Sequence, residues 1–497
     1  MNFEFLELTE LRKQLDEKKF SSLELTKYFL SRIKSLDKTL NSFITITEEQ
    51  ALVEAKNADD FIAAKGENAF LCGIPYAAKD LFNTSGVRTT AASKILDNYI
   101  SPYDSTVVSK LKQQKSVLLG KTNLDQFAHG SSGETSAYGS THNPWDVTRM
   151  PGGSSSGSAT AVSSGLAPWA LATETGGSIR QPSSLTGICG WKPTYGRVSR
   201  YGVIAMASSL DSIGAMGYSV RDLAAIAEII SGVDSKDSTT GLGEAPIYSK
   251  NLSSDLSNMK VGIPKQYFIE GMEEGVKQRV LEAIDELKKL GAKLVEVDLP
   301  NTKYGSLVYA IICPSEVSSN LSRYDGIRYG HSANAAAKNL MEVYAKSRAE
   351  GFGDEAKRRI LTGTYVLSAG YYDAYYKKAQ KVRRLIVNEF AEVFKQVDVL
   401  ACPSVPSVAL PLGKAASDPL FGYIADQLNI PSSLAGLPAL SIPCGFARPS
   451  EGQAPSMDGL PVGLQIIGPQ WGEQKIFNVG FAYQQATGWH MKHPSVS

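Results

Sequence analysis

Cysteine and histidine are scarce in this chain of 497 residues, which has five of each. The cysteines are scattered, odd in number and include no CxxC pair, which argues against a disulfide framework and a structural zinc site. The histidines match no zinc-binding spacing. The sequence therefore predicts that this chain holds no metal of its own.

The chain also lacks an excess of either charge and any long apolar run. Its 51 Lys and Arg residues balance 50 Asp and Glu residues, so nothing indicates a broad basic face for nucleic acid or anionic lipid. No window of 18 apolar residues exists, which argues against a membrane-spanning helix. The start, MNFEFLELTELRKQLDEKK, is charged and helical in period, unlike a signal peptide. We expect a soluble cytoplasmic protein, with any RNA held by a partner.

Hydrophobic residues make up 43% of the chain, enough to bury a large core. Strand-like apolar runs alternate with helical patterns, which implies an α/β fold with a mostly parallel sheet. Ser21 with Glu24 and Thr47 with Gln50 have capping-box spacing, and Gly291 is a natural helix cap. Helices are expected within 4–66, 104–115, 272–290 and 369–397, and strands at 71–79, 116–122 and 293–299.

Residues 151–187 form the most unusual segment, with nine serines and seven glycines among 37 residues. Such a composition is typical of a flexible linker. However, the middle of the segment, AVSSGLAPWALAT, is a run of the buried type, and GGS occurs near both ends. A glycine-rich backbone that brings its N–H groups close to a substrate explains this pattern better.

Two short segments resemble common motifs, but each lacks a feature that its motif requires. LLGKT at 118–122 resembles part of a phosphate-binding loop, but Lys115 stands where that loop needs glycine. Residues 153–157 fit G-x-S-x-G, yet the nucleophile elbow requires an apolar strand before it, and NPWDVTRMPG precedes instead. Nothing in the sequence points to a Ser-His-Asp triad.

Three separated motifs resemble those of the amidase signature family. They are GIPYAAKD (73–80), PGGSSSGSA (151–159), and TETGGSIRQP (173–182) leading into GICGWKPTYGR (187–197). The resemblance implies an α/β amidase-signature fold, with a central mixed β-sheet flanked by helices on both faces. It also implies a single domain over 1–497, made of a helical segment (about 1–66), a signature core (about 67–245) and a C-terminal portion (about 246–497) that completes the sheet and the substrate pocket.

The resemblance also implies a catalytic triad of Lys79, Ser154 and Ser178, in which a cis peptide holds Ser154. A serine hydroxyl is a poor nucleophile until a base takes its proton, and lysine is a base only when neutral. Burial favours the neutral amine, and Lys79 follows an apolar strand. Ser154 is expected to pass the proton between Lys79 and Ser178. The backbone amides expected to form an oxyanion hole are those of Thr175, Gly176, Gly177 and Ser178.

Further segments, 192–214, 318–330, 351–383 and 459–468, resemble a narrower group within that family: the A subunits of bacterial aspartyl/glutamyl-tRNA amidotransferases. This resemblance implies a glutaminase that works without its own cofactor and sends ammonia through an internal channel to the B subunit. That partner would use ATP and Mg²⁺ to convert misacylated Glu-tRNA(Gln), Asp-tRNA(Asn) or both to the cognate amides. A small C subunit would complete a heterotrimer.

Matching positions imply a glutamine pocket. Arg358 would bind the α-carboxylate, since a planar guanidinium suits a carboxylate. Asp426 would bind the α-ammonium, and Tyr309 and Ser131 would complete the polar lining. The pattern DEAKRR around Arg358 is by itself typical of an exposed helix arginine.

The sequence departs from the family pattern beside the catalytic loop. Ser156 stands where the family usually has glycine, and Glu174 stands where aspartate is usual. A stand-alone amidase acting on another small amide is the alternative function, and the pair of Arg358 and Asp426 argues against it. A catalytically silent scaffold would lack at least one triad residue, and all three are present.

Overall fold

The computed structural model describes residues 2–64, 69–241, 243, 245–415, 421–450 and 459–495. Within them, eleven strands form one sheet in the order β1-β3-β2-β4-β6-β5-β10-β11-β9-β7-β8. The strands are β1 (Phe43–Ile46), β2 (Pro75–Lys79), β3 (Val117–Thr122), β4 (Trp169–Glu174), β5 (Cys189–Lys192), β6 (Ser212–Gly217), β7 (Lys260–Pro264), β8 (Lys293–Val297), β9 (Val399–Pro403), β10 (Ala439–Ala447) and β11 (Leu460–Ile467).

The sheet is mixed, so the expectation of a mostly parallel sheet is wrong. Parallel pairs join β2 with β3 and β4, and β7 with β8 and β9. The other pairs between the described strands are antiparallel. The β2–α4–β3 and β7–α8–β8 segments contain the helical crossover that parallel neighbours need. The alternation of strands and helices in the sequence pattern was clearest in these two segments, and for this reason it favoured a parallel sheet. At the centre of the sheet, β6 pairs antiparallel with both β4 and β5.

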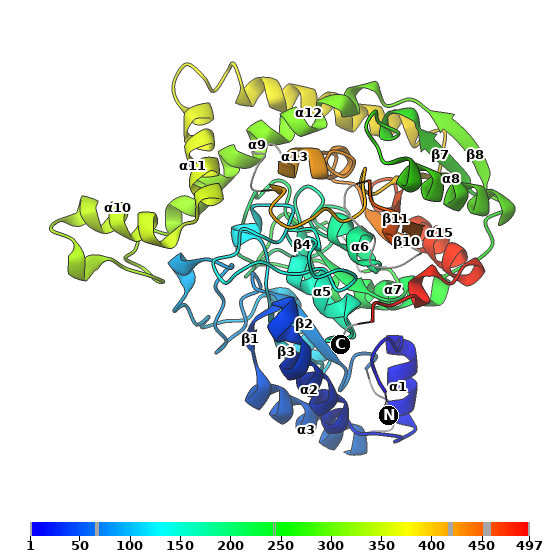
Figure 1. The fold of residues 1–497 in the computed structure, drawn as a ribbon, viewed down its shortest axis with the longest axis horizontal. Helices are drawn as coiled ribbons and strands as arrows, with labels where there is room; N and C mark the ends of the chain where they lie inside the picture. Colours follow the sequence, from blue (N-terminus) through cyan, green and yellow to red (C-terminus); the bar gives the residue numbers. More distant parts are fainter. Residues whose placement is uncertain are drawn as a thin grey trace.

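Helices cover the sheet on both faces (Figure 1). The central strands β2, β4, β5 and β6 are buried at every residue, which requires cover on each side. The helices are α1 (Leu8–Asp16), α2 (Ser22–Leu40), α3 (Glu48–Ala64), α4 (Thr106–Gln113), α5 (Ser156–Ser163), α6 (Arg180–Thr186), α7 (Val220–Ile230), α8 (Glu274–Lys289), α9 (Gly305–Asn320), α10 (Leu340–Gly351), α11 (Asp354–Leu367), α12 (Tyr376–Val393), α13 (Phe421–Ala425), α14 (Ile430–Leu434) and α15 (Glu473–Ala486).

Local signals in the sequence are confirmed in part. The capping box of Ser21 and Glu24 starts α2, and Gly291 follows α8 with a φ of +101°. Thr47 and Gln50 form no such box among the described residues: the Thr47 amide donates to the Leu119 carbonyl, and Gln50 Nε2 donates to Glu54 Oε1. The Thr47 hydroxyl donates to the Leu118 carbonyl and ties the turn before α3 to β3. The segment 4–66 contains the strand β1, and α12 begins only at residue 376, after Gly370 adopts a φ of +89°.

The division of the chain near residues 66 and 245 stays a prediction. The first boundary falls at 65–68, outside the described residues. No helix in the described ranges is long and apolar enough to span a bilayer.

Elements from both halves of the chain surround the centre of the sheet. The strand β2 ends at Lys79, and β4 ends at Glu174, immediately before the 175–178 loop. Helix α5 packs against both strands, α6 packs against α5, β5, β10 and β11, and α9 contacts α13 and α14. At the ends of β2 and β4, the glycine-rich 175–178 loop therefore meets helices from the C-terminal half of the chain.

Gly214 in β6 offers a test of this packing. A Cβ there would overlap the Trp191 carbonyl oxygen, which belongs to the neighbouring strand β5. Because backbone cannot move aside cheaply, Gly214→Ala should reduce the free energy of unfolding by roughly 1–3 kcal/mol, measured by urea unfolding. Gly217→Ala in the same strand is the control, since a Cβ there meets nothing closer than 3.6 Å. Equal effects of the two substitutions would contradict the packing described.

Candidate active site

Lys79 lies fully buried at the end of β2, with hydroxyl groups around its amine. Its Nζ lies 2.8 Å from Ser154 Oγ, 2.9 Å from Ser155 Oγ and 3.0 Å from Thr173 Oγ1. Burial lowers the pKa of Lys79 to about 7, although nearby carboxylates act in the opposite direction. At neutral pH a large share of the amine is therefore unprotonated.

The hydrogen bonds around Lys79 indicate which neighbour can give it a proton. Ser155 Oγ donates to the Thr173 carbonyl at 3.1 Å, so this hydroxyl must accept its bond from Lys79. A neutral amine has two N–H donors and one lone pair. One donor is directed to Ser155 and the other to Thr173, whose hydroxyl lies at 3.0 Å and whose carbonyl lies at 3.4 Å, so the lone pair is left for the Ser154 hydroxyl. The sequence did not identify Ser155 or Thr173, because both roles depend on the pairing of distant segments.

The segment that carries Ser154 is held by contacts on both sides. The Gly153–Ser154 peptide is cis, as the resemblance implied. The Gly153 amide donates to Gln181 Oε1 at 2.8 Å, and the Ser154 carbonyl accepts from the Asp125 amide at 3.2 Å. A Cβ at residue 153 would overlap the Asp125 carboxylate, so this approach requires glycine.

Ser178 lies beside this segment and is buried, with 3% of its surface exposed. The Ser155 amide donates to the Ser178 carbonyl at 3.3 Å, which brings the two loops together. Among the hydrogen bonds between described residues, none joins the hydroxyls of Ser154 and Ser178. That step of the expected relay stays a prediction.

The 175–178 loop offers free backbone donors. No hydrogen bond between described residues uses the amides of Gly176, Gly177 or Ser178, whereas the next amide, that of Ile179, donates to Glu174 Oε2 at 2.9 Å. Free amides in a buried loop are suited to an anionic oxygen. The Thr175 hydroxyl lies 3.0 Å from the Tyr309 hydroxyl. The expected role of the Thr175 amide in an oxyanion hole stays a prediction.

Glu174 and Arg180 form an ion pair that stabilises the 175–178 loop. Arg180 Nε donates to Glu174 Oε1 at 2.9 Å, and its Nη2 donates to Glu174 and to the Gly176 carbonyl. Burial raises the pKa of Glu174, but the Arg180 guanidinium outweighs burial and lowers it below the ordinary value. The glutamate at this position therefore stays ionised and holds both Arg180 and the end of the loop.

Ser156, the other departure from the family pattern, is also accommodated. It begins α5, and its hydroxyl lies 3.1 Å from the Thr141 hydroxyl. Among the described hydrogen bonds, Lys79 contacts Ser154 and Ser155 of this segment and not Ser156.

A cavity of about 570 Å³ is lined by Ser131, Glu355, Arg358 and Tyr423, among others, and residues 175–178 are not part of its lining. Ser131 Oγ donates to Asp426 Oδ2 at 2.8 Å, while Asp426 Oδ1 is buried and has no partner among the described residues. Burial raises the pKa of Asp426 to about 8. A Cβ at Gly177 would overlap Asp426 Oδ1, so the unpaired oxygen lies directly against the loop.

The four residues expected to form a glutamine pocket are therefore only partly joined. Ser131 and Asp426 bind one another, and Tyr309 of α9 contacts the loop through Thr175. Arg358 of α11 lines the same cavity as Ser131, but its guanidinium is paired with Glu355.

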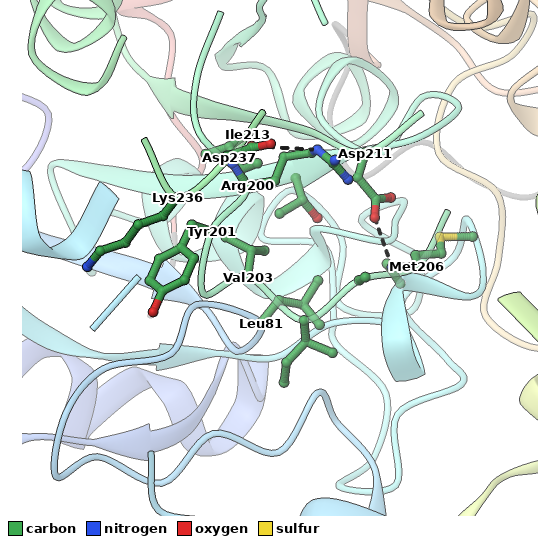
Figure 2. A pocket seen from close by; sticks show the side chains of 13 residues that line it. Leu81, Arg200, Tyr201, Val203, Met206, Asp211, Ile213, Lys236 and Asp237 are labelled. Carbon is green, nitrogen blue, oxygen red and sulfur yellow. Dashed lines mark hydrogen bonds and ion pairs between the residues drawn. The ribbon is translucent and has the colours of Figure 1, made fainter. Parts of the chain in front are cut away.

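A second cavity, of about 210 Å³, is shown in Figure 2, and Thr173 is among its lining residues. Arg200 and Asp211 lie on its wall, and the Asp211 carboxylate accepts from the Met206 amide at 2.9 Å. Residues 203–205 line both this cavity and a larger one of about 700 Å³ at the surface. Lys79 thus has a cavity near it other than the one that holds Arg358.

No group of three or more His, Cys, Asp or Glu in the described part of the chain could hold a metal ion. The five cysteines are free and buried.

The family model described as Amidase matches residues 24–477, more than nine-tenths of the chain. The chain belongs to the amidase family. Similar members include the A subunit of the glutamyl-tRNA(Gln) amidotransferase of Thioalkalivibrio sulfidiphilus, which is 51% identical over 487 residues, 98% of each chain. The crystal structure of the protein of the same name from Thermotoga maritima is 40% identical, with a TM-score of 0.82 over 100% of this chain and 99% of that one. A peptide amidase from Stenotrophomonas maltophilia is 30% identical, with a TM-score of 0.84 over 99% of both chains.

For this amidase, amide hydrolysis should rise with pH through about 7 and then level off. Below that pH Lys79 carries a proton and cannot accept another, and above it the amine is neutral. The measurement is kcat/KM between about pH 5 and pH 10. A rate that keeps climbing to the ordinary range of lysine would contradict the assignment.

Lys192 provides the matched control for that profile. Burial lowers its pKa to about 7 as well, but its Nζ donates to the carbonyls of Pro193 and Leu437. Lys192→Met should keep the midpoint near 7, whereas Lys79→Met should remove the rise.

Proposed function

We propose that this chain is the glutaminase subunit of a tRNA-dependent amidotransferase and hydrolyses the side-chain amide of glutamine through a Ser178 acyl-enzyme. The observation that carries the proposal is the buried amine of Lys79, which is surrounded by hydroxyl groups. It lies near the 175–178 loop, which has free amides and lies against the unpaired Oδ1 of Asp426. This arrangement supplies a base, an oxyanion site and a site for a cationic substrate group in one place.

The reaction uses the residues of the chain in sequence. Neutral Lys79 takes the Ser154 proton, and Ser154 takes the proton of Ser178 as Ser178 Oγ attacks the carboxamide carbon. The amides of Gly176 and Gly177 stabilise the resulting oxyanion, an effect worth about 3–4 kcal/mol for each donor. When the C–N bond breaks, the proton on Lys79 returns through Ser154 to the leaving nitrogen, which departs as ammonia. Water then hydrolyses the acyl-enzyme to glutamate.

An acid and a guanidinium suit the two charged ends of an amino acid. Burial keeps Asp426 largely protonated at neutral pH, and a cationic group placed beside it would lower its pKa and make it an anion. Asp426, with its unpaired Oδ1, would bind the α-ammonium, and Ser131 would hold the other oxygen of that carboxylate. Arg358 would bind the α-carboxylate through two parallel bonds. Tyr309, placed against Thr175, would border the reacting amide.

The names of the relatives support partners for this chain. We propose that it assembles with the B and C subunits in a heterotrimer, that ATP and Mg²⁺ act at the B subunit, and that Glu-tRNA(Gln), Asp-tRNA(Asn) or both reach the assembly through that same partner. The balance of charges agrees with RNA being bound elsewhere. The second cavity, near Thr173, is the proposed exit for ammonia. The cytoplasmic location stays a prediction.

A stand-alone amidase is the other candidate, supported by the likeness to a peptide amidase. Full-length identity of 51% to the A subunit of an amidotransferase favours the amidotransferase.

Ser178→Ala should abolish glutamine hydrolysis because it removes the oxygen that forms the acyl-enzyme. A reactive glutamine analogue should label the wild type at Ser178, as read by peptide mass spectrometry. Ser163→Ala is the control, since the Ser163 hydroxyl donates to the Thr186 carbonyl, away from the triad. Labelling at another residue, or turnover by Ser178→Ala, would rule out the nucleophile.

Arg358→Lys should raise the KM for glutamine far more than for 4-aminobutanamide, which is glutamine without its α-carboxylate. Lysine keeps the charge but loses the planar pair of donors. Steady-state kinetics with both amides measures the difference. An equal change in both would show that Arg358 does not bind the α-carboxylate.

A further inference from the structure

Arg358 is already bound to a carboxylate inside its own chain. Its Nε donates to Glu355 Oε2 and its Nη2 donates to Glu355 Oε1, both at 2.7 Å. Two parallel bonds of this kind are the geometry by which arginine binds a free carboxylate. Glu355 lines the same cavity as Arg358, so a protein carboxylate occupies the position that a ligand's carboxylate would take.

Glu355 also has a second partner, which it cannot leave as easily. Its Oε1 accepts from Arg359 Nε at 2.7 Å. The Arg359 side chain is only 5% exposed and lies over the Tyr423 ring, whereas the Arg358 side chain is 37% exposed. Removing the counter-charge of a buried guanidinium is strongly unfavourable, while a solvent-exposed ion pair contributes little. The Arg359 bond therefore fixes Glu355, and the Arg358 bond is the one that can exchange.

The charges of the pocket agree with such an exchange. Two arginines and two carboxylates line this cavity, and of the two carboxylates only Glu355 is paired with an arginine among the described residues. Glu355 thus serves two guanidinium groups, so a ligand carboxylate can take Arg358 while Glu355 keeps Arg359. A ligand without a carboxylate gains nothing by approaching Arg358, because Glu355 already satisfies it.

We propose that Glu355 is a placeholder for the α-carboxylate of the substrate and thereby sets the selectivity of the pocket. In the empty pocket Glu355 holds Arg358. When an amino-acid amide binds, its carboxylate replaces Glu355 at Arg358, and Glu355 stays with Arg359. The proposal rests on the proposed function, since it takes an α-carboxylate as the ligand of Arg358.

A crystal structure of Ser178→Ala with glutamine bound tests the exchange without altering Glu355. The Arg358 guanidinium should bind the glutamine carboxylate and lie beyond hydrogen-bond distance of Glu355 Oε2, while Arg359 Nε keeps its bond to Glu355 Oε1. Bound glutamine with the Arg358–Glu355 pair intact would overturn the placeholder. Glutamine bound with its carboxylate away from Arg358 would overturn the proposed pocket as well.

Glu355→Gln tests the kinetic consequence, because the amide oxygen of the substituted side chain can still accept from Arg359 while the charge that holds Arg358 is removed. Thermal unfolding of the variant checks that the loss of this charge leaves the fold around Arg359 intact. Because glutamine would no longer compete with an internal carboxylate, its KM should fall about threefold to fivefold with little change in kcat. The KM for 4-aminobutanamide should not fall. If Glu355 served only to position Arg358, the KM for glutamine would rise, and the placeholder would be rejected.

Asp354→Asn is the matched control. Asp354 begins α11 and lines the same cavity, but no ion pair joins it to an arginine among the described residues. It removes one negative charge without freeing Arg358, so its effect on the KM for glutamine should be less than about twofold. Equal effects of Asp354→Asn and Glu355→Gln would assign the change to general electrostatics and overturn the placeholder.

Different results would contradict the proposed substrate and the placeholder role of Glu355. If Arg358→Lys affects glutamine and 4-aminobutanamide equally, the proposed substrate is wrong. If Arg358→Lys is selective for glutamine but Glu355→Gln does not lower its KM, only the placeholder is wrong.

Discussion

Burial of the Lys79 amine is the constraint on which the rest of the site depends. The amine sits at the end of a strand that is covered on both faces, and burial lowers its pKa from 10.5 to about 7. A change of that size corresponds to roughly 5 kcal/mol of disfavoured charge. The surrounding fold must stabilise this arrangement, and the fully buried strands beside β2 supply the packing that does so.

The carboxylates near Lys79 do not pair with it because each has other partners. Asp125 accepts from the amides of Gly133 and Thr135. Glu174 is bound to Arg180, and Asp211 accepts from the amide of Met206. Each negative charge is thus satisfied within its own loop. Lys79 is left with hydroxyl groups, which stabilise a neutral amine and allow it to act as a base.

The resemblance of the motifs predicted the fold class, an amidase fold with a central mixed sheet, and this is confirmed. The same motifs pointed to Lys79, Ser154 and Ser178, and the structure places the three segments together, while their catalytic roles stay a prediction. Ser155 could not be distinguished from its serine neighbours, because its role comes from contacts with β2 and β4. The sequence also could not predict strand direction, since an apolar run does not show whether its neighbours in the sheet are parallel or antiparallel. The pairing of Glu355 with Arg358 and Arg359 was not predicted, although the DEAKRR pattern contains its signal, since residues three and four apart on a helix face one another.

The central claim is that Lys79 is neutral in the working protein, and its own titration tests this most directly. With ¹³Cε-labelled lysine, the Lys79 resonance can be assigned by its loss in Lys79→Arg and followed against pH by NMR. Assignment by substitution is essential, because burial lowers the pKa of Lys192 to about 7 and that of Lys121 to about 8. The account predicts a midpoint near 7 for Lys79. A midpoint near the ordinary lysine value of about 10.4 would contradict it, because the relay would then have no base.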